Sequence, residues 1–523
     1  MNKQEKPFLL SLSYRSSILL MLIAGGLNVF SFAPFHCWPL QIAGLMLLFS
    51  LLAREGTSAF TQRQSMWLAW SYSFAWLSTS VSWLLIALTR YGGLPMPVAL
   101  LAVSLLAAFL GSYAGLLVWL AQWLRQRWHF TSTVFVLLVL PAAWTLAEWL
   151  RIWLLTGFPW VISGYAHTAS PLAGFAPVFG VLGLSWLNAL IAGMCASTMI
   201  VRKKAFPLVI ALCLFIAGWA LGKIEWTLPY GHSLSVSLLQ GNVAQDMKFD
   251  PDHIVESLSL YHDMILAAPA DLVVTPETAL PVLSSQLPVD YLPMINAFAQ
   301  QTHSAVVLGL GVHDGGQRYS NSVLGFSPLH QQRAYRYDKH HLVPFGEFVP
   351  FGFRWFVDML HIPLGDFSSA GLMQAPMQVR DQSVMPNICY EDLFGEEIAQ
   401  QLSAQISAGG PVANMLLNTS NLAWYGDSIA IDQHLQISQM RVLETGRPML
   451  RATNTGATAV IDIHGVVIDQ LLPLTRGTLH ATVQGRSGKT PYLLFGNASV
   501  LLLILLSLLP AVWSGRQHRS ATV

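Results

Sequence analysis

Long apolar stretches constrain this chain more than any other feature of its sequence. Crossing a bilayer takes about 20 consecutive residues with few charges. Seven stretches of this kind precede a more polar region and an eighth follows it, and hydrophobic residues make up 53% of the 523 residues. We therefore expect a polytopic membrane protein with an α-helical transmembrane bundle of about eight spans. The stretches lie near residues 17–34, 38–53, 66–89, 96–122, 133–155, 174–200 and 206–222, and near 493–513.

The first two stretches are open to more than one interpretation. They are joined by residues 33–35, so the pair is either two tilted spans or one broken hairpin. The basic residues Lys3, Lys6 and Arg15 resemble the start of a signal peptide, but no small-residue cleavage site follows and further spans do. We interpret the first stretch as an anchor.

The distribution of Lys and Arg predicts the orientation in the membrane. Short loops rich in these residues stay in the cytoplasm. With the amino terminus inside, the outer segments hold little beyond Arg90 and Lys223. Both termini are therefore predicted to be cytoplasmic, with residues 225–490 outside. The inner segments hold Arg54, Arg63, Arg125, Arg127, Arg202, Lys203, Lys204, Arg516 and Arg519.

The polar region has the pattern of an α/β domain. Short apolar runs bounded by turn residues alternate with helical stretches at 251–267, 288–301, 395–404 and 428–445, which is typical of a layered α/β fold. We expect three parts: a bundle at 1–224, a catalytic domain at 225–490, and a last helix with its tail at 491–523. The net charge of +1 disfavours nucleic acid as a partner. The predicted strands are 234–239, 271–274, 305–312, 322–326, 383–388, 415–417 and 457–463.

Three polar residues follow strand-like runs, where side chains of an α/β sheet can converge. They are Glu277, Lys339 and Cys389. Each alone is more often a surface charge or a packed thiol. Together they supply a base, a cation for the developing oxyanion and a nucleophile, which is what thiol acyl transfer requires.

Several motifs around these residues resemble those of a known family. Residues 337–350, YDKHHLVPFGEFVP, are similar to the lysine segment of apolipoprotein N-acyltransferases, in the nitrilase superfamily. Residues 275–281 resemble the family's glutamate motif and residues 388–391 its cysteine motif. Residues 418–426 and 451–456 also match, so the resemblance covers the whole chain.

The resemblance implies an αββα sandwich in which Glu277 is the general base, Lys339 the oxyanion stabiliser and Cys389 the nucleophile. Glu347 would orient the lysine, Glu391 would be a further required carboxylate, and the Tyr390 backbone N–H would complete the oxyanion hole. The implied ping-pong reaction moves the sn-1 acyl chain of a phospholipid, such as phosphatidylethanolamine, onto the cysteine. The acyl chain then passes from the cysteine to the α-amine of the S-diacylglyceryl-cysteine of an apolipoprotein. The implied location is the bacterial inner membrane, with a periplasmic catalytic domain.

Other features carry less information. Glu148 and Arg151 share a helix face and favour a structural role. Residues 157–160 fit an outer interfacial loop or a lipid path, and residues 351–371 fit a lid or membrane-dipping loop beside the site. The glycines at 309–316 lack nucleotide-binding spacing, and the sixteen histidines form no metal motif. We expect neither cofactor nor metal.

Two rival functions remain open at this point. One is a membrane-tethered amidase or nitrile hydrolase, for which eight spans exceed the need. The other is a transporter or receptor, which favours polar residues deep within several spans, and few are present. Loss of activity in Cys389→Ala separates an enzyme from a binding protein.

Overall fold

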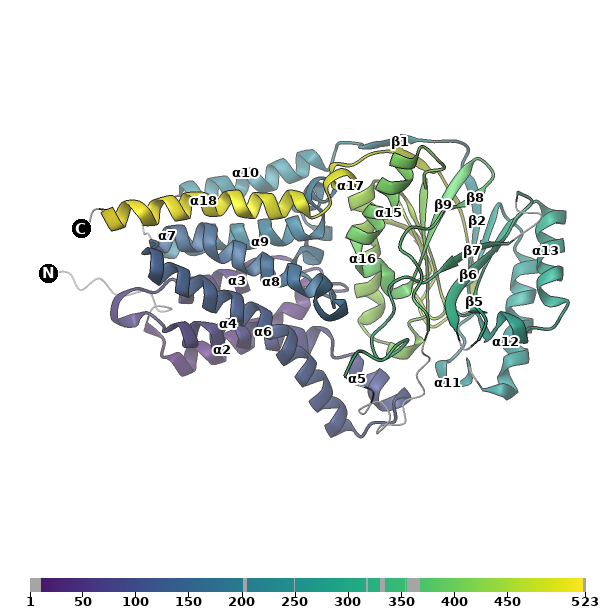
Figure 1. The fold of residues 1–523 in the computed structure, drawn as a ribbon, viewed down its shortest axis with the longest axis horizontal. Helices are drawn as coiled ribbons and strands as arrows, with labels where there is room; N and C mark the ends of the chain where they lie inside the picture. The colour runs from purple at the N-terminus through teal and green to yellow at the C-terminus, as the bar shows by residue number, and fades with distance from the viewer. Residues whose placement is uncertain are drawn as a thin grey trace. The chain divides into compact units, whose positions relative to one another are not determined.

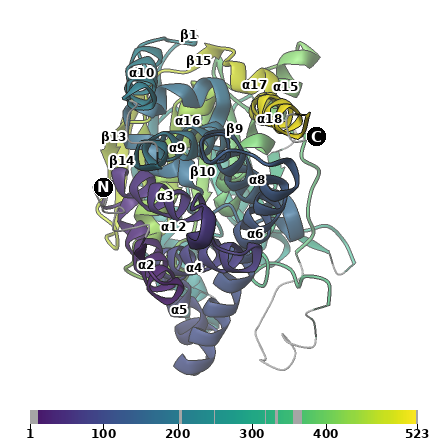
Figure 2. The same ribbon diagram turned by 90° about the vertical axis from the view of Figure 1, so that its left-hand side faces the viewer.

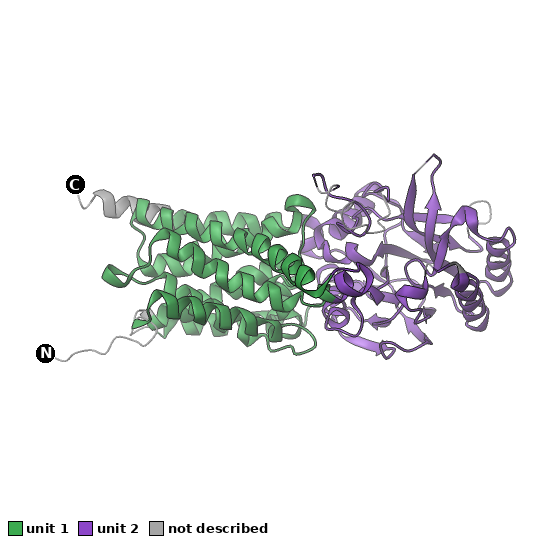
Figure 3. Ribbon diagram, turned by 90° about the horizontal axis from the view of Figure 1, so that it is seen from below, with its two compact units in different colours: residues 1–85, 95–224, 495–523 green, residues 86–94, 225–494 purple. Residues whose placement is uncertain are grey.

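The computed structural model describes residues 11–200, 205–248, 250–316, 318–329, 334–352, 354 and 367–520. The chain separates into two compact units (Figure 3). The first contains residues 1–85, 95–224 and 495–523, and the second contains residues 86–94 and 225–494. Most of the predicted lid (353 and 355–366) and the basic run 202–204 lie outside the described residues.

The first unit is a bundle of apolar helices, which Figure 1 shows running side by side and Figure 2 shows nearly end-on. Among the described residues, four helical stretches are long and apolar enough to cross a membrane, and one bent pair makes a fifth if it is counted as a single span. Several candidate spans are therefore present, while eight crossings stay a prediction. The four are Tyr14–Ser31, Met96–Trp128, Ser132–Thr156 and Pro171–Met199, and the bent pair is Gln62–Ser80 with Leu84–Tyr91.

Fewer candidate spans are present than the eight predicted, because three of the predicted spans contain only short apolar helices. Helix α3 (Pro39–Leu52) has 14 residues and α10 (Phe206–Leu221) has 16. At 1.5 Å per residue, 14 residues extend about 21 Å, less than the roughly 30 Å of a bilayer core. The third is Ala498–Pro510 within α18 (Ala498–Ser520). The other helices of ten or more residues described in this unit are α2 (Tyr14–Leu27), α4 (Gln62–Ser80), α6 (Met96–Trp128), α8 (Leu140–Trp153) and α9 (Ala176–Ile200).

Small residues let these helices approach one another closely. A Cβ atom on Gly25 of α2 would lie 2.1 Å from the carbonyl oxygen of Tyr72 in α4. One on Gly111 of α6 would lie 3.2 Å from the backbone nitrogen of Phe74. Such contacts are typical of helix packing in lipid, where tight van der Waals contact replaces the hydrophobic effect.

Glu148 and Arg151 are both buried within the bundle. The Glu148 carboxylate accepts a 3.0 Å hydrogen bond from the backbone N–H of Ser163 and another from its hydroxyl. Arg151 donates to the carbonyl of Trp160 at 2.6 Å, and the Trp160 side chain is itself buried. These side chains tie α8 to the loop that follows it, and Trp160 lies inside the unit.

The second unit contains a seven-stranded sheet and a six-stranded sheet. One has the order β14-β2-β3-β5-β6-β7, with β4 (Leu280–Leu283) paired to β5, and the other has the order β13-β12-β11-β10-β9-β8. The strands of the first are β14 (Gly477–Val483), β2 (Leu234–Gln240), β3 (Leu272–Val274), β5 (Ala305–His313), β6 (Tyr319–Phe326) and β7 (Tyr335–Asp338). Those of the second are β13 (Val467–Gln470), β12 (Ala459–Ile461), β11 (Met449–Thr453), β10 (Met415–Ser420), β9 (Gln382–Ile388) and β8 (Met377–Val379).

The two sheets pack face to face, and helices cover their outer faces (Figure 1). Side chains from both sheets, such as Leu238 and Leu417, form the shared core. Helices α12 (Pro251–Ala267) and α13 (Tyr291–Thr302) cover the first sheet. Helices α15 (Gly395–Ala408) and α16 (Ala430–Thr445) cover the second. The expected αββα sandwich is confirmed.

One short segment from the amino-terminal half packs with this sandwich. The Tyr91 hydroxyl donates to the Ala423 carbonyl at 3.2 Å, and its ring contacts the Trp424 ring edge-on at 5.4 Å. Arg90 pairs with Asp246 at 3.3 Å. Residues 86–94 therefore belong to the second unit by contact.

Candidate active site

The three predicted catalytic side chains come from the ends of three strands. Glu277 follows β3, Lys339 follows β7 directly and Cys389 follows β9 directly. Lys339 Nζ lies 3.3 Å from Glu277 Oε1. The thiol of Cys389 is close enough to both for their charges to change its pKa. The structure thus brings all three together.

Glu277 is buried and held by three donors. Its Oε1 accepts from Asn321 Nδ2 at 2.8 Å and from the Lys339 ammonium, and its Oε2 accepts from the backbone N–H of Asn421 at 2.9 Å. These bonds fix the position of both oxygens. A fixed carboxylate beside a thiol is placed to remove its proton.

Lys339 pairs with two carboxylates, because Glu347 Oε1 lies 2.9 Å from its Nζ in addition to Glu277 Oε1 at 3.3 Å. Burial by itself lowers the pKa of Lys339, but the two carboxylates outweigh it and hold the pKa above its ordinary value. The side chain is therefore an ammonium at neutral pH. Glu347 Oε2 also accepts from the backbone N–H of Val343 at 2.8 Å, so it orients the lysine from within the lysine's own segment.

The thiol of Cys389 rests in its protonated form. Burial, followed by the negative charge of Glu277, raises its pKa to about 12, against the lowering effects of Lys339 and of the Asn421 backbone N–H. A thiol with this pKa is a poor nucleophile at neutral pH. A reaction through this sulfur would therefore need a base that removes its proton.

Cys389 has a left-handed backbone, with φ of +53°, which a non-glycine residue seldom adopts. It opens the 3-10 turn Cys389–Leu393 at the end of β9. Glu391 in this turn accepts from the backbone N–H of Ile388 at 2.6 Å. This bond joins the turn to Ile388, the residue that precedes Cys389.

Glu391 also joins this turn to the lysine segment. Its carboxylate accepts from the Tyr337 hydroxyl at 3.0 Å and from the backbone N–H groups of His340 and His341 at 2.6 and 3.3 Å. Burial raises the pKa of Glu391, and these backbone donors oppose the rise. Glu391 therefore acts as a link between two strand ends.

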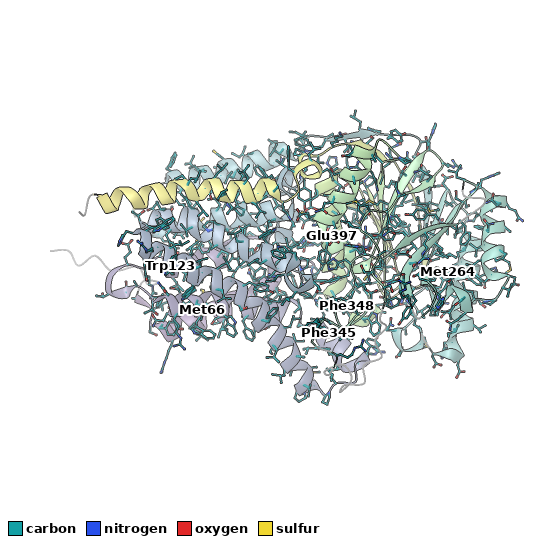
Figure 4. All side chains as sticks on the ribbon, in the orientation of Figure 1. Met66, Trp123, Met264, Phe345, Phe348 and Glu397 are labelled. Carbon is teal, nitrogen blue, oxygen red and sulfur yellow. The ribbon has the colours of Figure 1, made fainter. Side chains whose placement is uncertain are left out.

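Tyr390 places its backbone in the same turn, and its ring is buried. The ring packs against His341 and Phe394, with centroids 5.8 and 5.3 Å away. The two adjacent histidines have separate partners: His341 Nδ1 lies 3.0 Å from Glu397, labelled in Figure 4, and His340 Nδ1 lies 2.6 Å from the Ala370 carbonyl.

Comparison with known proteins identifies the family. Residues 24–194 match the model of the apolipoprotein N-acyltransferase N-terminal domain, and residues 235–492 match that of carbon-nitrogen hydrolases. The chain is 46% identical to the apolipoprotein N-acyltransferase of Ralstonia nicotianae, over 95% of this chain and 94% of that protein. The chain belongs to the apolipoprotein N-acyltransferase family. The Nitrosomonas europaea member is 41% identical over 94% of this chain and 97% of its own length, and the Bordetella bronchiseptica member is 40% identical over 95% and 96%.

Family membership confirms the resemblance seen in the motifs, and the αββα sandwich agrees with the carbon-nitrogen hydrolase match. The roles of the individual side chains in this apolipoprotein N-acyltransferase family member stay predictions. The contacts above are consistent with each role expected for Glu277, Lys339, Cys389 and Glu347.

Sequence reasoning missed several side chains of this site. Asn321 on β6 donates to both Glu277 and Glu347, at 2.8 and 2.7 Å. It is the third residue of β6 and lies between two serines, so the sequence does not distinguish it. Lys248, in the short helix α11 (Gln245–Lys248), is buried and donates to the Glu277 carbonyl at 3.1 Å. Nothing in the sequence distinguishes it from a surface lysine.

The buried Lys248 has a pKa lowered to about 8, because burial disfavours its charge more than Glu277 and Cys389 favour it.

The described residues contain no cluster of three His, Cys, Asp or Glu side chains suited to a metal ion. The expectation that the site works without a metal or cofactor stays a prediction.

Proposed function

We propose that this chain transfers the sn-1 acyl chain of a phospholipid, through a thioester on Cys389, to the α-amine of an S-diacylglyceryl-cysteine at the amino terminus of an apolipoprotein. The observation that carries the proposal is the grouping of Cys389 with the Lys339 ammonium and the Glu277 carboxylate at three strand ends. The name shared by the relatives supports the choice of acceptor.

In the first half-reaction, Glu277 removes the thiol proton and the sulfur attacks the ester carbonyl carbon of the phospholipid. The negative charge that forms on the carbonyl oxygen is stabilised by Lys339 Nζ and the Tyr390 backbone N–H. The carbon–oxygen ester bond then breaks. The leaving lysophospholipid alkoxide takes the proton from Glu277, and the acyl chain stays on sulfur as a thioester.

In the second half-reaction, the α-amine of the acceptor attacks the thioester carbonyl carbon and Glu277 takes the amine proton. The carbon–sulfur bond breaks to give the amide, and the thiolate recovers its proton from Glu277. A thioester reacts readily with amines, so the step needs no nucleotide. Both substrates carry long acyl chains, which suits a site that opens toward the bilayer and limits hydrolysis by water.

We also propose the location and organisation expected from the sequence. The bundle at 1–224 and the last helix at 491–523 would sit in the bacterial inner membrane with eight crossings. Residues 225–490 would form a periplasmic catalytic domain, and both termini would be cytoplasmic. The candidate spans of the first unit and the basic loops support this arrangement.

Denaturing mass analysis after exposure to a defined phosphatidylethanolamine tests the covalent step. The wild-type protein should gain the mass of one acyl chain, and Cys389→Ala should gain none. The matched control is Cys213→Ala, which removes an exposed thiol of α10 and should keep the adduct. An adduct that survives in Cys389→Ala would disprove the route through this sulfur.

The fate of the acyl chain separates transfer from hydrolysis. With a diacylglyceryl-cysteine peptide present, the adduct should disappear as an amide-linked third chain appears on the peptide. If free fatty acid forms at the same rate with and without the peptide, the amidase-like hydrolase is the better description.

A further inference from the structure

The carbonyl group of the nucleophile itself has two side-chain donors. His434 Nε2 lies 3.2 Å from the Cys389 carbonyl oxygen, and Asn418 Nδ2 lies 3.4 Å from it. His434 is on α16 and Asn418 on β10, and both are fully buried. Neither side chain has a part in the proton transfers described above.

The contacts of His434 determine which ring nitrogen carries the proton. Arg451 NH2 lies 2.9 Å from Nδ1. A guanidinium only donates hydrogen bonds and a carbonyl only accepts them, so Nδ1 has no proton and Nε2–H donates to Cys389. Burial, with the charges of Arg451 and Lys339, lowers the pKa of His434 well below its ordinary value, against a weaker opposing effect of the Cys389 carbonyl. The ring is therefore neutral and cannot serve as the base for the thiol.

Arg451 is fixed in turn. It lies on β11, is fully buried, and pairs with Asp392 Oδ2 at 3.3 Å. Ser438 donates to the same carboxylate and accepts from the Arg451 guanidinium. A continuous chain of polar contacts thus runs from Asp392 through Arg451 and His434 to the Cys389 carbonyl.

The geometry of the peptide bond extends this chain into the site. The Cys389–Tyr390 peptide is trans, so its carbonyl and its N–H point in opposite directions within one plane. Fixing the carbonyl therefore fixes the direction of the Tyr390 N–H. Hydrogen bonds accepted by a carbonyl also polarise the peptide and strengthen its N–H as a donor.

We propose that His434 is a positioning residue that orients and polarises the Cys389–Tyr390 peptide, so that the Tyr390 N–H binds the oxyanion more strongly. This inference rests on the proposed function, because it assigns His434 to stabilising the charge that forms during acylation of Cys389. It differs from a purely structural role for His434, which would affect every reaction of the thiol equally.

Two reactions of the same thiol distinguish these roles. Acylation forms an oxyanion, whereas alkylation by iodoacetamide displaces iodide directly and forms none. His434→Leu should slow acylation by about 10-fold, less than the 10²- to 10³-fold typical of losing a direct oxyanion donor. Its alkylation rate should stay within about twofold of the wild type, because the direct displacement does not use the Tyr390 N–H.

His434→Gln provides the conservative rescue, since its amide can donate to the carbonyl and accept from Arg451. It should recover most of the acylation rate. Asn418→Ala removes the second donor from the same carbonyl and should give the same selective loss, even if His434→Leu fails to accumulate. His480→Leu is the matched control, because His480 is exposed on β14 and contacts Ser237.

Infrared spectra of the acyl-enzyme, formed with a carbonyl-¹³C phospholipid, give an independent reading. The thioester carbonyl band should shift to higher frequency in His434→Leu, because its hydrogen bonds are weaker. A variant that acylates at the wild-type rate with an unshifted band overturns the inference. A parallel loss of alkylation and acylation also overturns it. If the wild-type protein forms no adduct at all, the proposed function fails instead.

Discussion

At the residue scale, two charges of opposite sign act on the pKa of the Cys389 thiol. Burial and Glu277 raise its pKa to about 12, while Lys339 lowers it. The resting site therefore keeps the sulfur protonated, with the Glu277 carboxylate near it. This arrangement suits an enzyme whose thiol should react only when an ester is bound, since a permanent thiolate is open to alkylation and oxidation.

The raised pKa predicts the pH dependence of direct alkylation. Because only the thiolate reacts, the iodoacetamide rate at Cys389 should rise about tenfold per pH unit from pH 7 to 9.5, with no plateau. An ordinary thiol levels off above about pH 8.5. Lys339→Met removes the charge that lowers the pKa of Cys389 and should slow alkylation throughout this pH range. Lys223→Met should not slow it, because Lys223 contacts the Trp219 ring and is not among the charges that change the pKa of Cys389. A plateau near pH 8.5 in the wild type contradicts the prediction.

The lowered pKa of Lys248 predicts that the free energy of unfolding depends on pH. Its folded pKa of about 8 lies below the roughly 10.4 of an unfolded lysine, so between these values the unfolded chain holds a proton that the folded chain has released. Stability contributed by this site should therefore rise with pH. Relative to Lys248→Met, the wild type should gain about 1.5 kcal/mol between pH 8 and 9.5.

Thermal unfolding of both proteins in detergent measures this gain. Each should carry Cys389→Ala, because the raised thiol pKa acts in the opposite direction above pH 9. A difference between the two proteins that stays constant with pH would show that Lys248 is not a buried, titrating group.

At the scale of elements, the site depends on how β7 and β9 end. Glu391 accepts four hydrogen bonds, from Tyr337, Ile388, His340 and His341. These donors belong to the two segments that carry Lys339 and Cys389. One buried carboxylate thus links the segment that carries Lys339 to the segment that carries Cys389.

Glu391→Gln tests this link. A carboxamide replaces one acceptor oxygen by a donor, so two of the four donors lose their partner, at about 1 to 3 kcal/mol for each buried group. We expect a lower unfolding temperature and an acylation rate reduced by about 100-fold, as follows from misplacing a catalytic group by about 1 Å. Glu256→Gln on α12 is the control, because Glu256 is exposed and pairs with His253 at 3.2 Å. An unchanged acylation rate in Glu391→Gln would remove Glu391 from the active site.

Local patterns predicted most elements of the sandwich. The helix predicted at 251–267 is α12 (Pro251–Ala267), and the strand predicted at 383–388 is β9 (Gln382–Ile388). Strands β4, β8, β11, β13 and β14 were not predicted, and of these Gly477–Val483 is only partly buried. Its pairing depends on a partner distant in sequence, which local periodicity does not report.

The site was predictable only where its residues stand in motifs. Glu277, Lys339 and Cys389 follow strands and form recognisable motifs, so their convergence was expected. His434 and Lys248 lie on helices with ordinary polar neighbours, and their roles depend on contacts with the backbone of other segments. Such contacts exist only in the folded chain, so the sequence does not reveal them.

At the scale of the whole molecule, the first unit exposes apolar side chains along its long helices. Helices of the first unit expose large apolar side chains, such as Leu105 of α6 and Leu212 of α10. In water such a surface promotes association, whereas in lipid it is the ordinary surface of a helix bundle. The second unit has its own core between two sheets. The apolar helix surfaces of the first unit support its proposed place in the membrane.

The proposed orientation predicts which positions a membrane-impermeant maleimide can reach. In a background with all four cysteines replaced, Val289→Cys places a thiol on an almost fully exposed site of the second unit. Thr57→Cys places one in the exposed turn between α3 and α4, next to the basic Arg54. Because basic loops stay in the cytoplasm, Val289→Cys should be labelled in intact spheroplasts and Thr57→Cys only after permeabilisation. The reverse labelling pattern would place the catalytic unit in the cytoplasm, where it could not meet exported lipoproteins.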